Sequence, residues 1–506
     1  MTSVFAFTSP TIDYHAFAPE LVLAVGICVV LLVDLFVPDS RRWITGTLSG
    51  FFMLAALVPV VTLAVLGDDV RSTLSGPGIT GRYVVDNFAL IMKALFLLSG
   101  YVVVLLSTNE MQEGGYYQGE FFVMLMSSLL GMVMISSSRD LIAVFVALEF
   151  LSIPAYMMAA WKKRDRKSNE AGVKYYLLGV FASAVMLYGM SLLYGIAGST
   201  LLTDIGSAVE LDGDKVGIQV VGIVFVIVGF AFKVSAVPFH TWAPDTYEGA
   251  PTPVTAFLSV ASKAAGFVGL IVLIFIAFPL AYDVYRPFLW VMAALTMTVG
   301  NLVALKQKNI VRMLAYSSVS QGGFILMPLA VAYTNGNESA SLRAVVVYLL
   351  IYAATNLGAF AVIIAVSRKT RSGEISSFGG LFQYAPGLTV MMTIFLASLA
   401  GIPPLGGWYA KFGAFRAAVD AGGGWGYGIA IIAAVNAVIA TAYYITVMRE
   451  MWMKPVPDGD VTPIQVPASL SAAIALCGVA TLVFGVVPGL IAKAGSITDL
   501  YGAFVP

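Results

Sequence analysis

The sequence predicts an all-α polytopic membrane protein with about fourteen transmembrane helices. Of its 506 residues, 59% are hydrophobic and 11% are charged, and the mean hydropathy is +0.89. Soluble domains carry about 25% charged residues. The apolar residues gather into runs of about 20, the length a helix needs to cross a hydrocarbon layer about 30 Å thick. Because unpaired backbone groups cannot face lipid, these runs must be helices, and a water-soluble globule is excluded.

Fourteen apolar runs follow one another along the chain, and each predicts one crossing. The first run has neither a basic leading segment nor a small-residue cleavage site, so we expect a retained helix and not a signal peptide. In order, the runs are 19–37, 43–66, 86–106, 120–136, 140–161, 171–197, 216–237, 253–277, 287–305, 310–333, 342–366, 386–417, 426–448 and 467–491.

The charges between the runs predict the orientation of the chain. Lys and Arg in short loops stay on the cytoplasmic side of a membrane. Loops after odd-numbered runs hold most of them, with clusters at 162–167 after the fifth run and at 368–371 after the eleventh. Loops after even-numbered runs hold few. This pattern puts both termini on the outer side.

The composition excludes several classes of function. The 28 Lys and Arg balance the 28 Asp and Glu, so no basic field is available to bind nucleic acid. Two cysteines and two histidines are too few for an iron–sulfur cluster or a structural zinc, each of which needs about four ligands. Cys28 and Cys477 each lie alone in an apolar run and are expected to be inert. We therefore expect no metal or cofactor in this chain.

Two runs are interrupted in related ways. Pro238 follows a lysine at the end of the seventh run, and Pro403 and Pro404 precede two glycines within the twelfth. The interrupted runs are five apart. A five-helix unit has odd parity, so two successive copies enter the membrane from opposite sides, as in the inverted repeats of many transporters. The alternative is that Pro and Gly are simply more frequent in membrane helices.

Four of the ionisable residues inside the runs are the most informative, because a charge near the bilayer centre costs at least about 2.5–3.5 kcal/mol. Glu149 lies roughly 13 Å from the start of its run and Lys263 roughly 15 Å, at about 1.5 Å per residue. Lys233 and Lys411 lie next to the two interruptions. Making and breaking a Glu149–Lys233 contact could load and unload protons. The alternative is that buried ion pairs only fix helix packing.

Other charged residues have weaker claims. Glu170 and Lys174 are spaced as neighbours on a helix, so an interfacial salt bridge is as good an explanation as a proton entry. His240 follows the first interruption and could relay protons or simply be a hydrogen-bonded loop residue. Lys93 is expected to extend to the membrane surface, and Glu20 to belong to a helix start.

Several segments together carry a family resemblance. These are APELVLAVGICVVLLVDLF, RDLIAVFVALEFLSIPAY, FKVSAVPFHTWAPDTYEGAPTP, RMLAYSSVSQGG and SLAGIPPLGGWYAKF. The chain resembles the subunit N family, antiporter-like membrane subunits of the bacterial proton-pumping NADH:quinone oxidoreductase, respiratory complex I. The resemblance implies three N-terminal helices in 1–118, inverted repeats in 119–280 and 281–450, and a loop and last helix in 451–506.

The resemblance also implies roles for the buried charges. Glu149, Lys233, Lys263 and Lys411 match the family's proton-translocating residues. Glu170 and Lys174 match a Glu/Lys pair that the family has in its sixth helix. His240 matches the family's histidine after the first interruption. Two positions depart from the family pattern, because Val311 precedes Arg312 and Gln321 stands where the family usually has a histidine. Glutamine cannot titrate, so a relay through that position would need water or another group.

The implied function is redox-driven proton translocation across the bacterial cytoplasmic (inner) membrane. FMN, iron–sulfur clusters and quinone are then expected in partner subunits, with the K-type and M-type subunits and membrane lipids as neighbours. One alternative is a subunit of a secondary, multisubunit cation/proton antiporter. Another is a structural spacer in which the buried charges only hold a membrane arm together.

Overall fold

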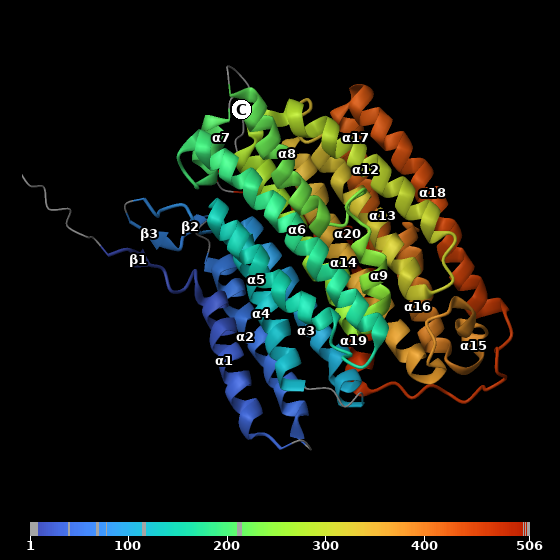
Figure 1. Ribbon diagram of the computed structural model, residues 1–506. Helices are drawn as coiled ribbons and strands as arrows, with labels where there is room; N and C mark the ends of the chain where they lie inside the picture. The colour runs from blue at the N-terminus through green and yellow to red at the C-terminus, as the bar shows by residue number, and fades with distance from the viewer. Residues whose placement is uncertain are drawn as a thin grey trace, which may run out of the picture.

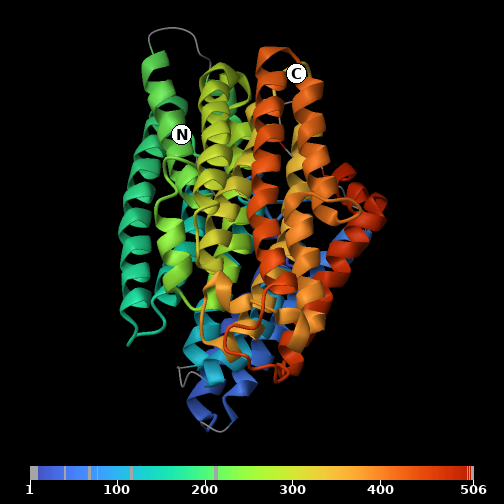
Figure 2. The ribbon, with the colours of Figure 1, turned by 90° about the vertical axis from the view of Figure 1, so that its right-hand side faces the viewer.

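Parallel and antiparallel helices pack into a single bundle in the computed structural model, which describes residues 9–38, 41–66, 70–76, 78–113, 118–209, 215–498, 500 and 502. The long helices run side by side, and α1 and α2 lie at one edge against α3 and α4 (Figures 1 and 2). The α-helices are α1 (Ala18–Phe36), α2 (Trp43–Leu66), α3 (Asn87–Glu113), α4 (Gln118–Ser137), α5 (Leu141–Ala159), α6 (Arg166–Ala197), α7 (Leu202–Ala208), α8 (Val216–Lys233), α9 (Trp242–Gly249), α10 (Thr252–Phe257), α11 (Lys263–Val272), α12 (Tyr282–Ala304), α13 (Ile310–Ala330), α14 (Glu338–Thr370), α15 (Leu381–Tyr384), α16 (Pro386–Ala400), α17 (Gly406–Ala421), α18 (Gly423–Met453), α19 (Ala468–Val486) and α20 (Pro488–Ser496).

Short strands and non-α turns complete the described chain. Strand β1 (Thr11–Ile12) pairs antiparallel with β3 (Leu74–Ser75), and β2 (Val70–Ser72) with β4 (Val84–Asp86). Two π-helical segments, Leu258–Ser262 and Leu273–Ala277, flank α11. The 3-10 turns are Pro279–Ala281 and Ile375–Phe378.

Twelve helical spans in the described part of the chain are long and apolar enough to cross a membrane. Every run predicted from the sequence is helical here, but the tenth and twelfth are not among these twelve spans. The tenth is α13, whose sequence includes several serines and Gln321. The twelfth is divided into α16 and α17, which are 15 and 16 residues long. The count of fourteen and the inverted repeats stay predictions.

Both predicted interruptions are present, and in each the freed backbone groups find partners. After α8 ends at Lys233, the amide of Val237 donates to Thr296 Oγ1 at 2.9 Å, and Trp242 Nε1 donates to the Phe232 carbonyl at 2.9 Å. Between α16 and α17, the amide of Gly407 donates to Ser398 Oγ at 2.9 Å. Non-helical backbone is tolerated at membrane depth only when it is satisfied in this way.

The span Thr252–Ala277 lies at the centre of the bundle, and the apolar residues of its membrane-crossing stretch are all enclosed by other helices. Helix α14 contacts it and is nearly as enclosed. By contrast, α1, α2, α6 and α18 keep broad apolar faces on the outside. A helix that is apolar all round must lie inside, so the two central helices define the core that holds the site.

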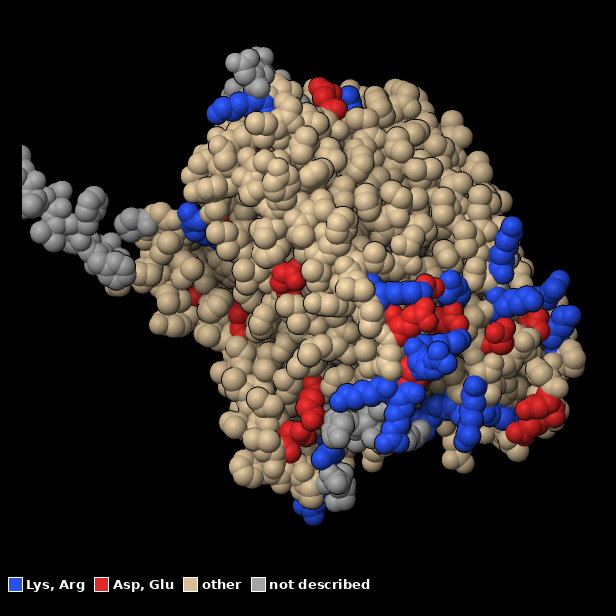
Figure 3. Space-filling view, in the orientation of Figure 1, with Lys and Arg blue, Asp and Glu red and all other residues tan. Residues whose placement is uncertain are grey.

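Charged residues gather at one end of the bundle, here called the basic end, while most of the visible face has none (Figure 3). Residues from the loops after the fifth, ninth and eleventh runs line a single cavity there, among them Lys162, Asn309 and Arg368. Helix caps define where these helices begin: Asp165 and Asn309 accept hydrogen bonds from the first amides of α6 and α13. The loops after the fifth, ninth and eleventh runs therefore lie together at this end.

Candidate functional site

Lys233 is buried at the end of α8, with 3% of its surface exposed. Its Nζ donates to Ser152 Oγ on α5 at 2.8 Å and to the Tyr175 hydroxyl on α6 at 3.3 Å. The ring of Tyr175 is stacked on Trp242, with centroids 4.4 Å apart. Helices α5, α6, α8 and α9 thus surround this amine, and among the described residues only hydroxyl groups form hydrogen bonds with it.

Glu149 lies on α5 and is partly exposed on the side of the bundle. It accepts a hydrogen bond from Ser183 Oγ on α6 at 2.5 Å. Among the described residues no ion pair joins Glu149 to Lys233, so the predicted direct contact is not formed. Ser152, one helical turn after Glu149, holds Lys233 instead, while the two charges interact through space.

Lys263 is the first residue of α11, directly after the π-helical segment Leu258–Ser262. Such segments break the regular backbone ladder and often occur at functional sites. Lys263 is 2% exposed, and its Nζ donates to the Ser318 carbonyl at 2.7 Å and to Ser318 Oγ at 2.6 Å, both on α13. No carboxylate of the described chain pairs with it.

Lys411 lies on α17, just after the second interruption, and is 5% exposed. Its Nζ donates to the Ala400 carbonyl at 2.9 Å, a group that the end of α16 leaves free. The same nitrogen lies 4.9 Å from the ring centre of Phe324. The interruption therefore supplies the oxygen that binds this ammonium group, which explains why the lysine and the Pro–Gly segment occur together.

Gln321 lies in the region between Lys263 and Lys411 and is fully hydrogen-bonded. Its Nε2 donates to the Leu399 carbonyl at 3.0 Å and to the Tyr444 hydroxyl at 3.3 Å, and its Oε1 accepts from the Tyr348 hydroxyl. Sequence reasoning noticed this position but missed the tyrosines and serines around it. Their only sequence signal is polarity inside helices that are otherwise apolar.

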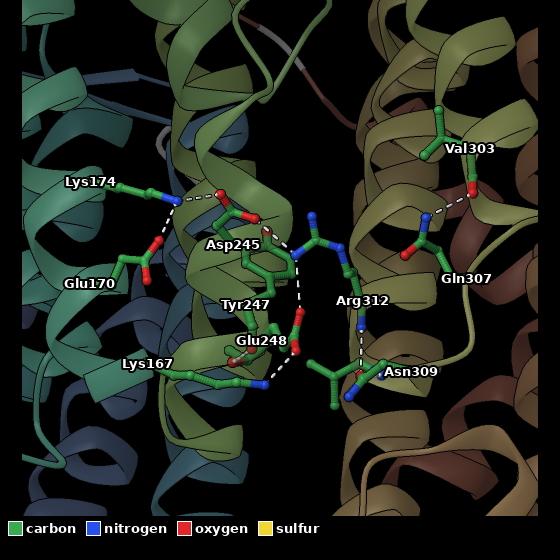
Figure 4. A network of polar contacts seen from close by, with 12 residues as sticks. Lys167, Glu170, Lys174, Asp245, Tyr247, Glu248, Val303, Gln307, Asn309 and Arg312 are labelled. Atoms are coloured by element: carbon green, nitrogen blue, oxygen red, sulfur yellow. Dashed lines mark hydrogen bonds and ion pairs between the residues drawn. The ribbon is translucent and has the colours of Figure 1, made fainter. Parts of the chain in front are cut away.

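A network of charges joins three helices at the basic end (Figure 4). Lys174 of α6 pairs with Glu170 at 2.5 Å and with Asp245 of α9 at 2.8 Å. Arg312 of α13 pairs with Asp245 at 2.8 Å and with Glu248 at 3.0 Å. The salt bridge between Glu170 and Lys174 is thus present, and it belongs to a larger network that the sequence did not predict.

The charges of this network keep its two α9 carboxylates ionised. Burial alone would raise the pKa of Asp245, but hydrogen bonds from Lys174 and Arg312 hold it below its ordinary value. Burial would likewise raise the pKa of Glu248, and hydrogen bonds from Lys167 and Arg312 lower it. Half-exposed groups with such partners hold helices together more readily than they exchange protons.

His240 lies in the interrupted segment between α8 and α9 and is half-buried. Its Nδ1 is buried and has no hydrogen-bond partner within the described chain. Asp245 and Glu248 follow it five and eight residues later in the sequence. In the structure both carboxylates are bound by lysine and arginine, so the histidine is separate from that network.

Lys93 corrects an expectation. It does not extend to the surface but is fully buried in α3, where its Nζ lies 2.7 Å from Glu20 Oε1 as an ion pair without hydrogen-bond alignment. The Tyr83 hydroxyl donates to the same carboxylate oxygen at 2.5 Å. Nearby, Arg139 and Asp86 form a second buried pair at 2.7 Å. Glu20 therefore does more than begin a helix, because its carboxylate contacts both Tyr83 and Lys93 inside the bundle.

No three His, Cys, Asp or Glu side chains in the described ranges come together as metal ligands would. The buried groups that could bind something are the amines of the three lysines and the hydroxyls around them. Amines and hydroxyls both donate and accept hydrogen bonds, so this arrangement can hold and pass protons.

Comparisons with known proteins concern the family and the fold of the chain. The family model described as NADH:quinone oxidoreductase/Mrp antiporter, transmembrane, matches residues 138–438. The chain is 38% identical to NADH-quinone oxidoreductase subunit N of Trichlorobacter lovleyi over 95% of this chain and 96% of that protein. It is also 38% identical to subunit N of Chloroflexus aggregans, covering 96% of each.

Solved structures share the fold. A chain of respiratory complex I from Thermus thermophilus with bound aureothin superposes with a TM-score of 0.76 at 29% identity, over 95% of this chain and all of that one. A chain of the Mrp complex from Dietzia sp. superposes with a TM-score of 0.83 at 20% identity, over 96% and 97% of the two chains, and shows the fold alone.

Proposed function

This chain belongs to the NADH:quinone oxidoreductase/Mrp antiporter family as a member of subunit N, and on that premise we propose which of its residues move protons. It is a proton-translocating membrane subunit of an NADH:quinone oxidoreductase, whose electron transfer takes place in other subunits. FMN, iron–sulfur clusters and quinone belong, in this proposal, to those partner subunits.

Glu149 and Lys233 form the loading site, Lys263 is the central relay, and Lys411 is the carrier on the exit side. The observation that carries this assignment is that all three lysines are buried, and that among the described residues none has a carboxylate partner. A purely structural role calls for paired charges. An amine held only by hydroxyl or carbonyl oxygens can give up and regain its proton without breaking an ion pair.

Residues at the basic end have supporting roles. Glu170 and Lys174 lie near the surface beside the loading site, where protons would enter, and His240 adds a further titratable group in the interrupted segment. These three residues are proposed as entry or relay groups. The contacts of these three residues support a role in proton entry. This support is less direct than the support that burial gives to the proton-carrying roles of Lys233, Lys263 and Lys411.

The placement in the membrane follows from the charges. The basic end faces the cytoplasm of a bacterium and both termini face outward, because basic loops are retained inside. Residues 1–118 form the N-terminal helices, 119–280 and 281–450 two inverted repeats, and 451–506 the loop and last helix. The neighbours in the membrane are the K-type and M-type subunits and lipid, and the broad apolar faces of α6 and α18 supply surfaces for them.

Lys233→Met and Lys411→Met test this assignment in the assembled enzyme. Each variant is expected to abolish most proton translocation per NADH oxidised, because methionine keeps the apolar volume but cannot carry a proton. Inverted membrane vesicles with a pH-sensitive dye give the translocation rate, and gel electrophoresis of the native complex gives its amount. Lys454→Met, an exposed lysine at the basic end, is the control and should pump normally.

Three other outcomes would contradict the proposal. Normal pumping in both variants would remove the lysines from the proton path. Loss of the complex without a separate pumping defect would favour a structural spacer. Cation-dependent proton flux in vesicles without NADH would favour the secondary antiporter.

A further inference from the structure

The two lysines that the proposed path uses last, Lys263 and Lys411, lie on α11 and α17 and do not touch. Residues of α13 and α14 separate them. Gln321, the residue in the position where a titratable histidine would serve, is held on both sides of its amide by Leu399, Tyr444 and Tyr348. A glutamine amide does not titrate. Because the Gln321 amide is also held in place by its hydrogen bonds, it lines the proton path without carrying protons.

Tyr352 of α14 is differently placed. Its hydroxyl is buried and lies close to the Ser318 hydroxyl, and no hydrogen bond of regular geometry engages it within the described chain. Ser318 Oγ is the same atom that accepts from Lys263 Nζ at 2.6 Å. An unpaired buried hydroxyl is rare and needs a physical reason. Here it adjoins the only side-chain group that holds Lys263 in the described structure.

Tyr352 also lines a small cavity. It measures about 10 Å³ and is lined by Tyr352, Thr355, Ser398 and Lys411 among others. A space of about 10–15 Å³ on this measure holds one water when polar partners surround it. Tyr247 also lies beside Ser318 with an unpaired hydroxyl, but it does not line this cavity. Tyr352 is thus the residue that adjoins both Ser318 and the space beside Lys411.

We propose that Tyr352 relays protons between Lys263 and Lys411 through Ser318 and one water in this cavity, and that Gln321 does not carry them. The inference rests on the roles proposed above for the two lysines. The ammonium of Lys263 gives a proton to Ser318 Oγ, whose own proton passes to Tyr352. The tyrosine releases its proton to the water, and the water releases one to the amine of Lys411. Each hydroxyl gains one proton and loses one, so only the two lysines change charge.

Tyr352→Phe in the assembled enzyme is the test, because it removes one hydroxyl and preserves the ring. The variant should lose on the order of tenfold in the rate of proton translocation, a modest share of the rate factor that a positioned proton carrier contributes. Tyr285→Phe is the matched control, since Tyr285 is also a buried tyrosine with an unpaired hydroxyl but does not line the cavity. It should pump normally.

Two further variants separate a relay from a structural effect. Ser318→Ala keeps the backbone carbonyl that binds Lys263 but interrupts the same route, so it should show the same loss. Adding Gln321→His to Tyr352→Phe places a titratable ring beside the cavity and should restore most of the pumping. Normal pumping in both Tyr352→Phe and Ser318→Ala, or no recovery with the histidine, would overturn the relay.

Lys263→Met and Lys411→Met belong in the same assay. If they pump normally, the proposed roles of the lysines fail and the relay fails with them. If they lose pumping while Tyr352→Phe and Ser318→Ala retain it, the lysines stand and only the relay is wrong.

Discussion

Lys93 and Lys411 are both buried lysines, yet their surroundings give them different roles. Lys93 is paired with Glu20, whose second contact comes from the Tyr83 hydroxyl. Lys411 has one backbone carbonyl and an aromatic face. A paired buried charge is fixed, since separating it leaves an uncompensated ion, whereas an unpaired amine is free to exchange its proton. Burial by itself does not distinguish the roles of the two lysines. The presence or absence of a carboxylate partner does.

Removing one member of the Glu20–Lys93 pair should therefore destabilise the protein. Lys93→Met or Glu20→Gln is expected to lower stability by about 3–5 kcal/mol, the usual result of leaving one buried partner alone. The double variant should recover part of that loss. Thermal unfolding of the purified complex, followed in detergent, measures the effect, with Lys454→Met as the exposed control. A melting curve of Lys93→Met that matches the native protein would refute the pairing.

At the scale of elements, interrupted and irregular helices place the polar groups. The ends of α8 and α16 free backbone groups that Thr296, Trp242 and Lys411 satisfy. At the basic end, α9 is attached to α6 and α13 through its two carboxylates. Because α9 follows the interruption directly, this network holds the short helix that closes the loading site.

The α9 network should make stability depend on pH in a predictable direction. The folded pKa values of Asp245 and Glu248 lie below their ordinary values of 3.8 and 4.5. Their contribution is therefore fully present above those values and is lost as the pH falls through the lowered folded values. Half-exposed pairs are screened by water, so the combined effect is on the order of 1 kcal/mol.

The measurement compares unfolding temperatures of the native complex and the double variant Asp245→Asn/Glu248→Gln. The native protein should be the more stable from pH 6 to pH 8, and the difference should shrink once the pH drops below about 4. Asp420→Asn, which alters an exposed pair on α17, serves as the control. A difference that stays constant down to low pH would show that the carboxylates are not what stabilises α9.

At the scale of the whole molecule, the distribution of charge serves two purposes. Most basic residues lie in loops that orient the bundle, and a few amines remain inside it near the enclosed central span. Moving one charge through 100 mV is worth about 2.3 kcal/mol. A chain of buried amines can move a charge against this potential only if water reaches the two ends of the chain from opposite sides of the membrane. The enclosed centre of the bundle keeps the two sides separate.

The orientation predicts which residues are accessible from each side. In a chain with Cys28→Ala, a cysteine at Lys454 should react with a membrane-impermeant maleimide only in inverted vesicles. A cysteine at Ser207, exposed between α6 and α8, should react only in vesicles of native orientation. Cys477 is buried and supplies the background. The reverse labelling pattern would invert the proposed topology.

The sequence by itself determined the mainly helical membrane fold, the two interruptions and the three buried lysines. These follow from local properties: run length, proline and glycine chemistry, and the cost of charge in an apolar segment. Only the tertiary structure decided the partners. It showed that Glu149 and Lys233 do not touch, that Lys93 is paired, and that Tyr352 lies between Ser318 and the cavity beside Lys411. Partners depend on which helix faces pack together, and a serine or tyrosine in an apolar run does not reveal its neighbour.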